Sequence, residues 1–191
     1  VTSISGLLQA VNDGVVTGEE AKEFLAISLQ ETTRMQKMVG DLLEFNSFTA
    51  NAIPVNRESV KIGEVINEMI YQWDIVQDDQ LVKVTVQQLK EDMVVSADPL
   101  RLQQIMINLL NNSKHAIQGE GTIAVRIYKY DEEHVAIDVQ DSGSGIPPAE
   151  QDLIFERFYR GEEKKYKIRG LGLGLPFSRM LAKAMDGDLV L

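Results

Sequence analysis

The chain has 191 residues, of which 44% are apolar and 25% charged, as expected of a globular protein that buries a core. Its net charge of −10 argues against binding to a nucleic-acid backbone, because such proteins cluster Lys and Arg. It has no cysteine for disulfides or zinc–thiolate sites, and no apolar run approaches the roughly 18 residues of a membrane span. We expect this part of the protein to be cytoplasmic and without membrane contact of its own, which leaves a membrane tether of the parent protein open. Because the helical pattern already runs at Val1, we also expect a fragment.

Residues 1–48 contain no proline and are predicted to be helical on both sides of a glycine-containing break at NDGVVTGEE (12–20). From about residue 19 to 47, positions in steps of three or four follow the 3.5-residue period of a coiled coil. These positions are Leu25, Leu29, Thr32, Met35, Val39, Leu42 and Asn46. The spacing predicts a helical hairpin whose long second helix lacks part of its partner. A dimeric four-helix bundle through residues 1–48 would cover that stripe.

The stretch NSFTANAIPVN (46–56) is predicted to be a polar hinge, and the chain beyond it mixes helical and strand patterns. Asp98 and Pro99 are typical of the start of a helix. The predicted helices are 60–73, 97–117 and 174–185, and the predicted strands are 81–89, 122–130, 134–140 and the start of one at 188–191. Antiparallel strands with helices on one face favour an α+β sandwich.

The stretch DSGSGIPP (141–148) follows a predicted strand and raises three possibilities. A calcium loop is disfavoured, because it needs several side-chain oxygens at alternating positions. A plain turn, in which Gly143 and Gly145 serve backbone geometry, stays open. The third possibility is a binding site: glycines let a ligand approach the backbone, and Asp141 can accept a hydrogen bond from an exocyclic amine.

A second glycine-rich stretch, GLGLGL (170–175), opens the last predicted helix. Backbone N–H groups at such a helix start can face an anion. It is not a Walker A loop, because Leu175 and Pro176 stand where Lys and Ser or Thr are required, and no strand leads into it as in a Rossmann turn. The basic stretch before it, RFYRGEEKKYKIRG (157–170), is either a solvated loop or a lid over a polyphosphate.

Helix 97–117 carries Asn108 and Asn112 four residues apart, with His115 one turn further on the same face. Carboxamide oxygens are hard, neutral ligands suited to Mg²⁺, which keeps waters and substrate phosphates as its other ligands. A lone asparagine would more simply line the polar side of the helix, and a lone histidine is more often structural. The pair in register within a run of Leu and Ile favours a metal and phosphate site.

Together, in this order, these motifs resemble the kinase core of two-component sensor histidine kinases, whose ATPase superfamily includes DNA gyrase and the Hsp90 chaperones. RLQQIMINLLNNSKHAI (101–117) resembles the family's N box, DSGSGIPP its first glycine box, IFERFYRG (154–161) its F box, and GLGLGLPFSRMLAKAM (170–185) its second glycine box. ETTRMQKMVGDLLEF (31–45) is similar to the second helix of the dimerisation and phosphotransfer hairpin. The resemblance implies a hairpin over 1–48, a linker over 49–56 and an ATP-binding domain over 57–191 with a truncated last strand.

The resemblance further implies ATP and Mg²⁺ as cofactors. Asp141 would accept the adenine amino group, Asn112 would coordinate Mg²⁺, and Phe155 and Phe158 would anchor a lid. The implied nucleotide-binding residues are Asn108, Asn112, His115, Asp141, Gly143, Gly145, Ile146, Arg157, Arg160, Gly170, Leu171, Gly172, Leu173 and Gly174. The implied activity moves the γ-phosphoryl group of MgATP to a histidine and onward to an aspartate of a response regulator, within a homodimer formed through residues 1–48.

Two departures from the family pattern matter. The phosphoacceptor histidine lies in a motif like HELRTPL just before the segment that resembles residues 1–8, so we expect it upstream of Val1 and expect this fragment to bind MgATP without phosphorylating itself. Neither His115 nor His134 can replace it. His115 and Ala116 stand where many relatives have Lys and an aromatic residue, which leaves one phosphate contact and the stacking on adenine open. The alternative function is a signalling scaffold without catalysis. A serine kinase of the anti-sigma-factor type is disfavoured by the hairpin.

Overall fold

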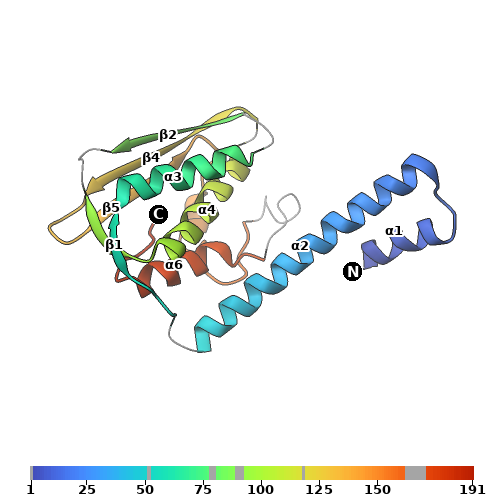
Figure 1. The fold of residues 1–191 in the computed structure, drawn as a ribbon, viewed down its shortest axis with the longest axis horizontal. Helices are drawn as coiled ribbons and strands as arrows, with labels where there is room; N and C mark the ends of the chain where they lie inside the picture. Colours follow the sequence, from blue (N-terminus) through green and yellow to red (C-terminus); the bar gives the residue numbers. More distant parts are fainter. Residues whose placement is uncertain (1, 51–52, 78–80, 89–92, 118, 162–170) are drawn as a thin grey trace. The chain divides into compact units, whose positions relative to one another are not determined.

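Two units, residues 1–51 and 52–191, make up the chain in the computed structural model (Figure 1). The structure describes residues 2–50, 53–77, 81–88, 93–117, 119–161 and 171–191. None of the helices in these ranges is both long enough and apolar enough to cross a membrane.

The first unit is a helical hairpin in which α1 (Thr2–Asn12) packs against α2 (Gly18–Ala50). Its turn uses Gly14 and Gly18 at positive φ angles of 69° and 61°. Helix α2 continues to Ala50, beyond the predicted end at about residue 47 and into the stretch predicted to be a hinge. Much of the predicted apolar seam is exposed in the single chain, including Leu29 at 69% and Val39 at 53%.

The second unit contains two sheets and the remaining helices. Its elements are β1 (Glu58–Lys61), α3 (Ile62–Ile75), β2 (Val82–Gln88), β3 (Val94–Ala97), α4 (Pro99–Ala116), β4 (Gly121–Lys129), β5 (Val135–Asp141), α5 (Pro148–Gln151) and α6 (Gly174–Ala184). Strands β1 and β3 pair antiparallel, and a separate sheet has the order β2-β4-β5. The mixed helix and sheet architecture predicted from the sequence is confirmed.

Several local predictions differ from the structure. Strands β4 and β5 form the predicted antiparallel hairpin, but β2 and β4 are parallel, because the chain between them crosses over through α4 instead of turning back. Residues 58–61 form strand β1, so the helix predicted from residue 60 begins at Ile62. The segment 188–191, predicted to start a strand, is not part of a strand in the structure.

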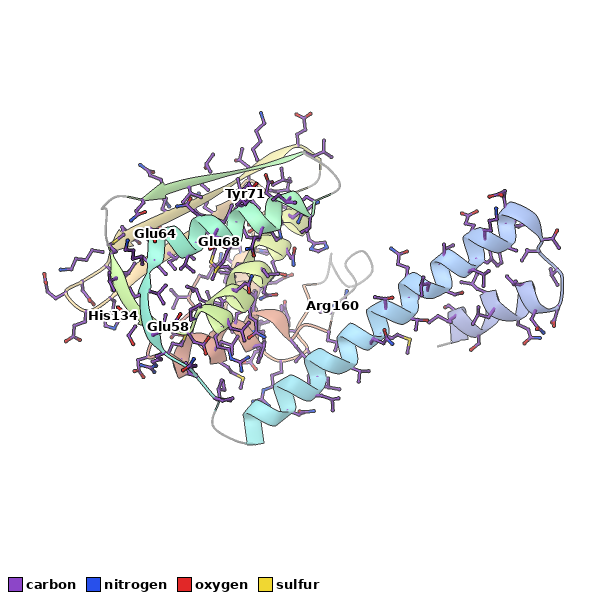
Figure 2. The ribbon with its side chains drawn as sticks, viewed as in Figure 1. Glu58, Glu64, Glu68, Tyr71, His134 and Arg160 are labelled. Carbon is purple, nitrogen blue, oxygen red and sulfur yellow. The ribbon has the colours of Figure 1, made fainter. Side chains whose placement is uncertain are left out.

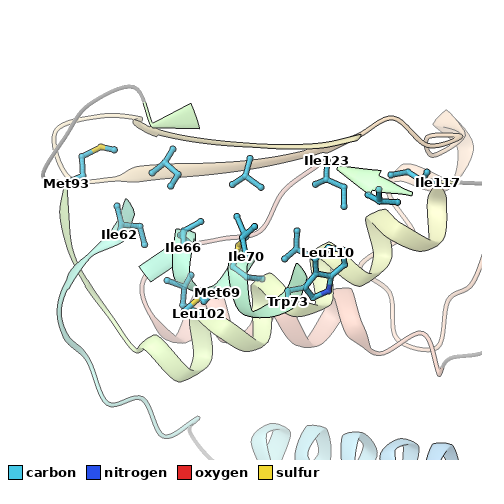
Figure 3. Close-up of a cluster of buried hydrophobic side chains, with 14 residues drawn as sticks. Ile62, Ile66, Met69, Ile70, Trp73, Met93, Leu102, Leu110, Ile117 and Ile123 are labelled. Carbon is cyan, nitrogen blue, oxygen red and sulfur yellow. The ribbon is translucent and has the colours of Figure 1, made fainter. Parts of the chain in front are cut away.

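The main core lies between the three-stranded sheet and helices α3 and α4, which cover the same face of it (Figure 3). Most of its side chains come from one face of each helix and from alternate positions of β4. They are Ile62, Ile66, Met69, Ile70 and Trp73 of α3, Leu102, Met106 and Leu110 of α4, and Ile123, Val125 and Ile127 of β4, joined by Val82, Met93 and Ile117. The outward side of α3 carries Glu64, Glu68 and Tyr71, which are exposed (Figure 2). A smaller cluster joins Ile105 of α4 to Leu181 and Ala182 of α6. Helix α4 therefore packs on the sheet with one face and on α6 with another.

Asp98 caps the start of α4, as the sequence predicts. Its Oδ1 accepts hydrogen bonds from the backbone N–H groups of Leu100 at 3.0 Å and Arg101 at 3.2 Å. Its Oδ2 accepts a third from the N–H of Asn56 at 2.8 Å. Burial of the carboxyl group acts to raise its pKa, but the backbone hydrogen bonds outweigh burial and lower the pKa below its usual value. The charged form of Asp98 therefore stabilises the start of this helix.

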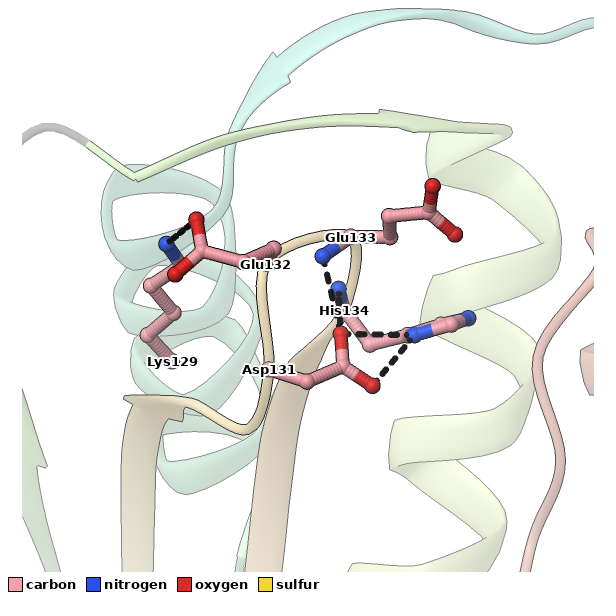
Figure 4. Close-up of polar contacts among 5 residues, drawn as sticks. All are labelled: Lys129, Asp131, Glu132, Glu133 and His134. Atoms are coloured by element: carbon pink, nitrogen blue, oxygen red, sulfur yellow. Dashed lines mark hydrogen bonds and ion pairs between the residues drawn. The ribbon is translucent and has the colours of Figure 1, made fainter.

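The tip of the β4–β5 hairpin is held by Asp131 (Figure 4). Its Oδ1 accepts hydrogen bonds from the backbone N–H groups of Glu133 at 2.8 Å and His134 at 2.7 Å. The imidazole Nδ1 of His134 lies 2.9 Å from the same carboxylate, and Lys129 pairs with Glu132 at 2.7 Å. The hydrogen bond from the Glu133 backbone, with those from His134, lowers the pKa of Asp131. His134 thus belongs to a turn.

Candidate functional site

Three asparagines of α4 have different surroundings. The carboxamide of Asn108 donates a hydrogen bond from Nδ2 to Ser178 Oγ of α6 at 2.8 Å. Asn111 accepts one from Trp73 Nε1 at 2.9 Å, which joins α4 to α3. Asn112 is exposed and forms no hydrogen bond with any residue that the structure describes. Of the two asparagines predicted to face a metal, Asn112 therefore has its carboxamide available to a ligand.

The first glycine segment, Asp141–Ile146, begins where β5 ends. Asp141 is half-buried, and its Oδ1 accepts a hydrogen bond from the Gly143 N–H at 2.9 Å. Within the described ranges no residue bonds to Oδ2. Ser142 continues the pairing with β4, because its N–H donates to Thr122 O at 3.0 Å and its Oγ accepts from Thr122 N at 2.9 Å. These contacts fix the backbone around a carboxylate that retains one unused oxygen.

The two glycines of this segment have different reasons to be glycine. A Cβ on Gly143 would lie 2.6 Å from the backbone oxygen of Ala116, so the segment packs directly on the end of α4. Gly145 has a φ of 72°, and nothing described lies within 4 Å of the position a Cβ would take. Ile146 is tied to α5 through its carbonyl, which accepts from Gln151 Nε2 at 3.1 Å. Open space therefore lies beside Gly145.

The second glycine segment is described from Leu171 to Gly174, and the predicted contact at Gly170 lies outside the described residues. Gly172 has a φ of 69°, and a Cβ there would lie 2.5 Å from the backbone oxygen of Tyr159. Leu173 is buried. Gly174 starts α6 so close to α4 that a Cβ would lie 2.4 Å from Asn108 Oδ1. Close packing between backbone segments thus accounts for Gly172, and packing against Asn108 accounts for Gly174.

The predicted lid anchors, Phe155 and Phe158, are placed differently from each other. The guanidinium of Arg179 lies 4.7 Å from the centre of the Phe155 ring, and Phe155 is half-buried. Phe158 is 60% exposed, and its backbone, at a φ of 64°, donates a hydrogen bond to Gly172 O at 3.1 Å. Arg157 is exposed, and Arg160, which Figure 2 labels, is half-buried. The rest of the predicted lid, residues 162–169, lies outside the described part of the chain.

His115 and Ala116 occupy the last turn of α4, next to Gly143. The imidazole Nδ1 of His115 lies 2.5 Å from the carbonyl oxygen of Asn111, so one ring nitrogen is engaged by its own helix. The ring itself is exposed. Ser178 is a residue that the sequence analysis missed: it is buried and bonds to Asn108. A polar residue four positions after Gly174, within an apolar helix face, was the signal for it.

Helix α4 thus lies against both glycine segments, with Gly174 beside Asn108 and Gly143 beside Ala116. These two positions on the helix are about 12 Å apart at 1.5 Å per residue, and Asn112 stands between them. The arrangement offers a carboxylate acceptor at one end and the start of a helix at the other. Among the described residues, no group of three or more Asp, Glu or His side chains is placed to hold a metal ion.

Comparison with known proteins shows which families and structures this chain is similar to. Residues 97–191 match the model of the family described as histidine kinase-, DNA gyrase B-, and HSP90-like ATPase. The sensor histidine kinase WalK of Bacillus subtilis (strain 168) is 29% identical over 99% of this chain. The aligned region is 31% of WalK, so the chain spans about a third of that relative.

Two solved structures share the fold over nearly the whole chain. Full-length ShkA in complex with AMPPNP is 22% identical, with a TM-score of 0.75, over 96% of this chain and 38% of that one. The histidine kinase ThkA in complex with the response regulator protein TrrA is 23% identical, with a TM-score of 0.77, over 97% of this chain and 51% of that one. Residues 97–191 thus match a histidine kinase-, DNA gyrase B- and HSP90-like ATPase domain, and the similarities together support a sensor histidine kinase catalytic ATPase region in this chain.

Proposed function

We propose that this chain is the ATP-binding and dimerisation core of a two-component sensor histidine kinase, with its nucleotide site on α4. The observation that carries this proposal is the first glycine segment. Asp141 is fixed through Oδ1 by the Gly143 N–H, while Oδ2 is unused by any described residue. Open space lies beside Gly145. A carboxylate held in this way fits the exocyclic amine of adenine, which donates hydrogen bonds.

The residues present also fit Mg²⁺ with a polyphosphate. The carboxamide of Asn112 is exposed and uncommitted, and Mg²⁺ takes one or two protein oxygens beside phosphates and waters. When bound, Mg²⁺ would neutralise charge on the phosphates. Asn108 would act indirectly, because its carboxamide is bonded to Ser178 and holds the start of α6 in place. The N-terminal end of α6 would then attract the phosphates through its free N–H groups and its dipole.

The chain's part in catalysis is to bind and orient the nucleotide. Phosphoryl transfer depends mainly on positioning and charge stabilisation. In our proposal the γ-phosphoryl group passes to a histidine that none of these residues supplies, and then to an aspartate of a response regulator. The solved complex of ThkA with TrrA supports a receiver-type partner.

The hairpin is proposed to form the homodimer. Leu29 and Val39 lie on the 3.5-residue seam of α2 and are exposed in the single chain. Burial of such a seam against a second copy is the usual way to cover it.

Isothermal titration of the chain with AMPPNP and Mg²⁺ tests the proposal. We expect binding by the unaltered chain and a loss of about 10- to 100-fold in affinity for Asp141→Asn, because a hydrogen bond to a charged acceptor is lost. GMPPNP should bind more weakly, since guanine offers a carbonyl oxygen where adenine offers an amine. Asp152→Asn, an exposed change of the same charge, is the control.

Two results would count against the proposal in different ways. Unchanged affinity of Asp141→Asn would show that the adenine lies elsewhere. No binding of AMPPNP to the unaltered chain would remove the nucleotide site altogether and would favour a scaffold that keeps the fold without catalysis.

A further inference from the structure

The segment Ile53–Arg57, through which the chain enters the second unit, lies against the ends of two site helices. Ile53 packs on the cluster formed by α4 and α6. The N–H of Asn56 donates to Asp98 Oδ2 at the start of α4, at 2.8 Å. Arg57 reaches the end of α6, where Nη2 donates to Ala184 O at 2.8 Å and Nη1 to Asp186 Oδ2 at 2.5 Å. One short segment therefore holds the ends of α4 and α6 that lie away from the glycine segments.

Asp186 has a backbone conformation that points to a specific use of its side chain. Its φ is 62°, in the left-handed region that residues with a side chain disfavour. The glycine, Gly187, comes one position later. The position just after a helix end usually belongs to glycine. Here its carboxylate accepts from Arg57, and this hydrogen bond together with the Arg57 charge lowers the pKa of Asp186. The strained conformation places the Asp186 carboxylate beside the Arg57 guanidinium. The guanidinium itself lies at the C-terminal end of α6, where the helix dipole is negative.

Helix α6 connects this contact to the nucleotide site. It runs from Gly174 to Ala184, about 16 Å at 1.5 Å per residue. Its start lies against Asn108, and its buried residues include Ser178 and Leu181. A well-packed helix moves as a unit, so a displacement at Ala184 is carried to Gly174.

We infer that Arg57 is a positioning residue for the nucleotide site, which it influences by holding α6. Docking of Ile53–Arg57 and binding of the nucleotide are then coupled: each strengthens the other by the same factor, as linkage requires. This inference rests on the proposed function, because it needs a nucleotide at the start of α6. In addition, nucleotide binding strengthens the docking of Ile53–Arg57, and docking of this segment strengthens nucleotide binding.

Nucleotide affinity measures the first half of the coupling. We expect Asp186→Asn and Arg57→Met to weaken AMPPNP binding about 3- to 10-fold in isothermal titration, and Arg57→Lys to restore part of that loss by keeping the charge. Asn tolerates the left-handed conformation, so Asp186→Asn removes the ion pair without new strain. Glu132→Gln is the matched control, because it removes an exposed ion pair with Lys129 at the tip of the β4–β5 hairpin.

Hydrogen exchange at the Asn56 amide measures the second half, since this N–H is bonded to Asp98. AMPPNP should slow its exchange at least threefold in the unaltered chain and in Glu132→Gln, and should slow it less in Asp186→Asn. A purely structural role would lower the melting temperature of Asp186→Asn but leave the nucleotide-induced slowing intact.

The outcomes separate the two claims. Suppose that the unaltered chain binds AMPPNP. If Asp186→Asn then binds AMPPNP with the same affinity as the unaltered chain, and AMPPNP slows exchange at Asn56 equally in both, the coupling is overturned and the proposed function is not. If the unaltered chain does not bind AMPPNP, the proposed function falls and the coupling with it. Should Arg57→Met unfold, Asp186→Asn and Arg57→Lys decide the question.

Discussion

The glycines of the two segments pack against their neighbours by different means, and the differences show which parts of the candidate site are rigid. Gly143 and Gly172 each approach a backbone oxygen, of Ala116 and Tyr159, which cannot rotate away from an added Cβ as a side chain can. The three atoms nearest to a Cβ on Gly174 belong to the Asn108 side chain, whose end can rotate. At Gly145, no atom of the residues that the structure describes lies within 4 Å of the position that a Cβ would take. Glycines that look alike in sequence therefore fall into three physical classes.

The largest effect is expected at Gly172, where positive φ and a backbone clash coincide. Gly172→Ala should lower the free energy of unfolding by about 2–4 kcal/mol, the sum of left-handed strain and overpacking. Urea denaturation measures this. The control is Gly145→Ala, which shares the positive φ without a neighbour and should lose only about 1–2 kcal/mol. Equal losses for the two variants would mean that the close approach to Tyr159 contributes nothing to the loss of stability in Gly172→Ala.

Gly143→Ala should come next, with a loss of about 1–3 kcal/mol in the free energy of unfolding. The new methyl group would meet the Ala116 carbonyl, and the segment would have to move away from α4. Because Asp141 bonds to the Gly143 N–H, nucleotide affinity should fall in the same variant. Ser144→Ala, at the next position, adds no atom and should change neither quantity. A Gly143→Ala variant as stable as Ser144→Ala would contradict the close packing.

Helix α4 supports both segments, and its cap gives a pH test. The pKa of Asp98 is lowered in the folded protein, so its contribution to stability is full above its unfolded pKa of about 3.9 and is lost as the pH falls through the lower folded pKa. Asp98→Ala should cost about 1–2 kcal/mol at pH 7, and the difference from the unaltered chain should shrink below about pH 4. Urea titrations between pH 7 and 2 measure it. A difference that stays constant to pH 2 would rule out the charged cap.

The smallest effect concerns Gly174 and separates a movable neighbour from a fixed one. Gly174→Ala should displace the Asn108 side chain and weaken its hydrogen bond to Ser178, for a loss of about 1 kcal/mol. In an Asn108→Ala background the same change should be nearly neutral, so the double-mutant cycle should show a coupling of about 1 kcal/mol. Additive losses would show that the two residues do not interact.

The sequence predicted elements that have strong local signals. Asp98 and Pro99 mark the start of α4, and an apolar period long enough to define its face runs through the helix. The hairpin of β4 and β5 follows from alternation around DEE. Strands β1 and β3 were missed because each has only four residues, too few for a period, and β1 runs directly into α3. The parallel pairing of β2 and β4 was missed because alternation in a strand says nothing about its direction.

The sequence could nominate residue types for the candidate site, but it could not predict the contacts between them. Asp141 and Asn112 could be singled out because few side chains can recognise an amine or bind Mg²⁺. The bond between Asn108 and Ser178 joins residues 70 positions apart, and that between Arg57 and Asp186 joins residues 129 apart. No local pattern encodes such pairs, because they depend on how α4 and α6 pack.

The parallel pairing of β2 with β4 has a consequence for how the protein is made. Strand β2 leaves the ribosome before residues 89–120, which include α4, and only then does β4 follow. At about 5–20 residues per second, β2 waits for about 2–6 s before its partner is synthesised. The helix that carries Asn108 and Asn112 is therefore synthesised before β4, and the candidate nucleotide site must be among the last parts of the domain to form.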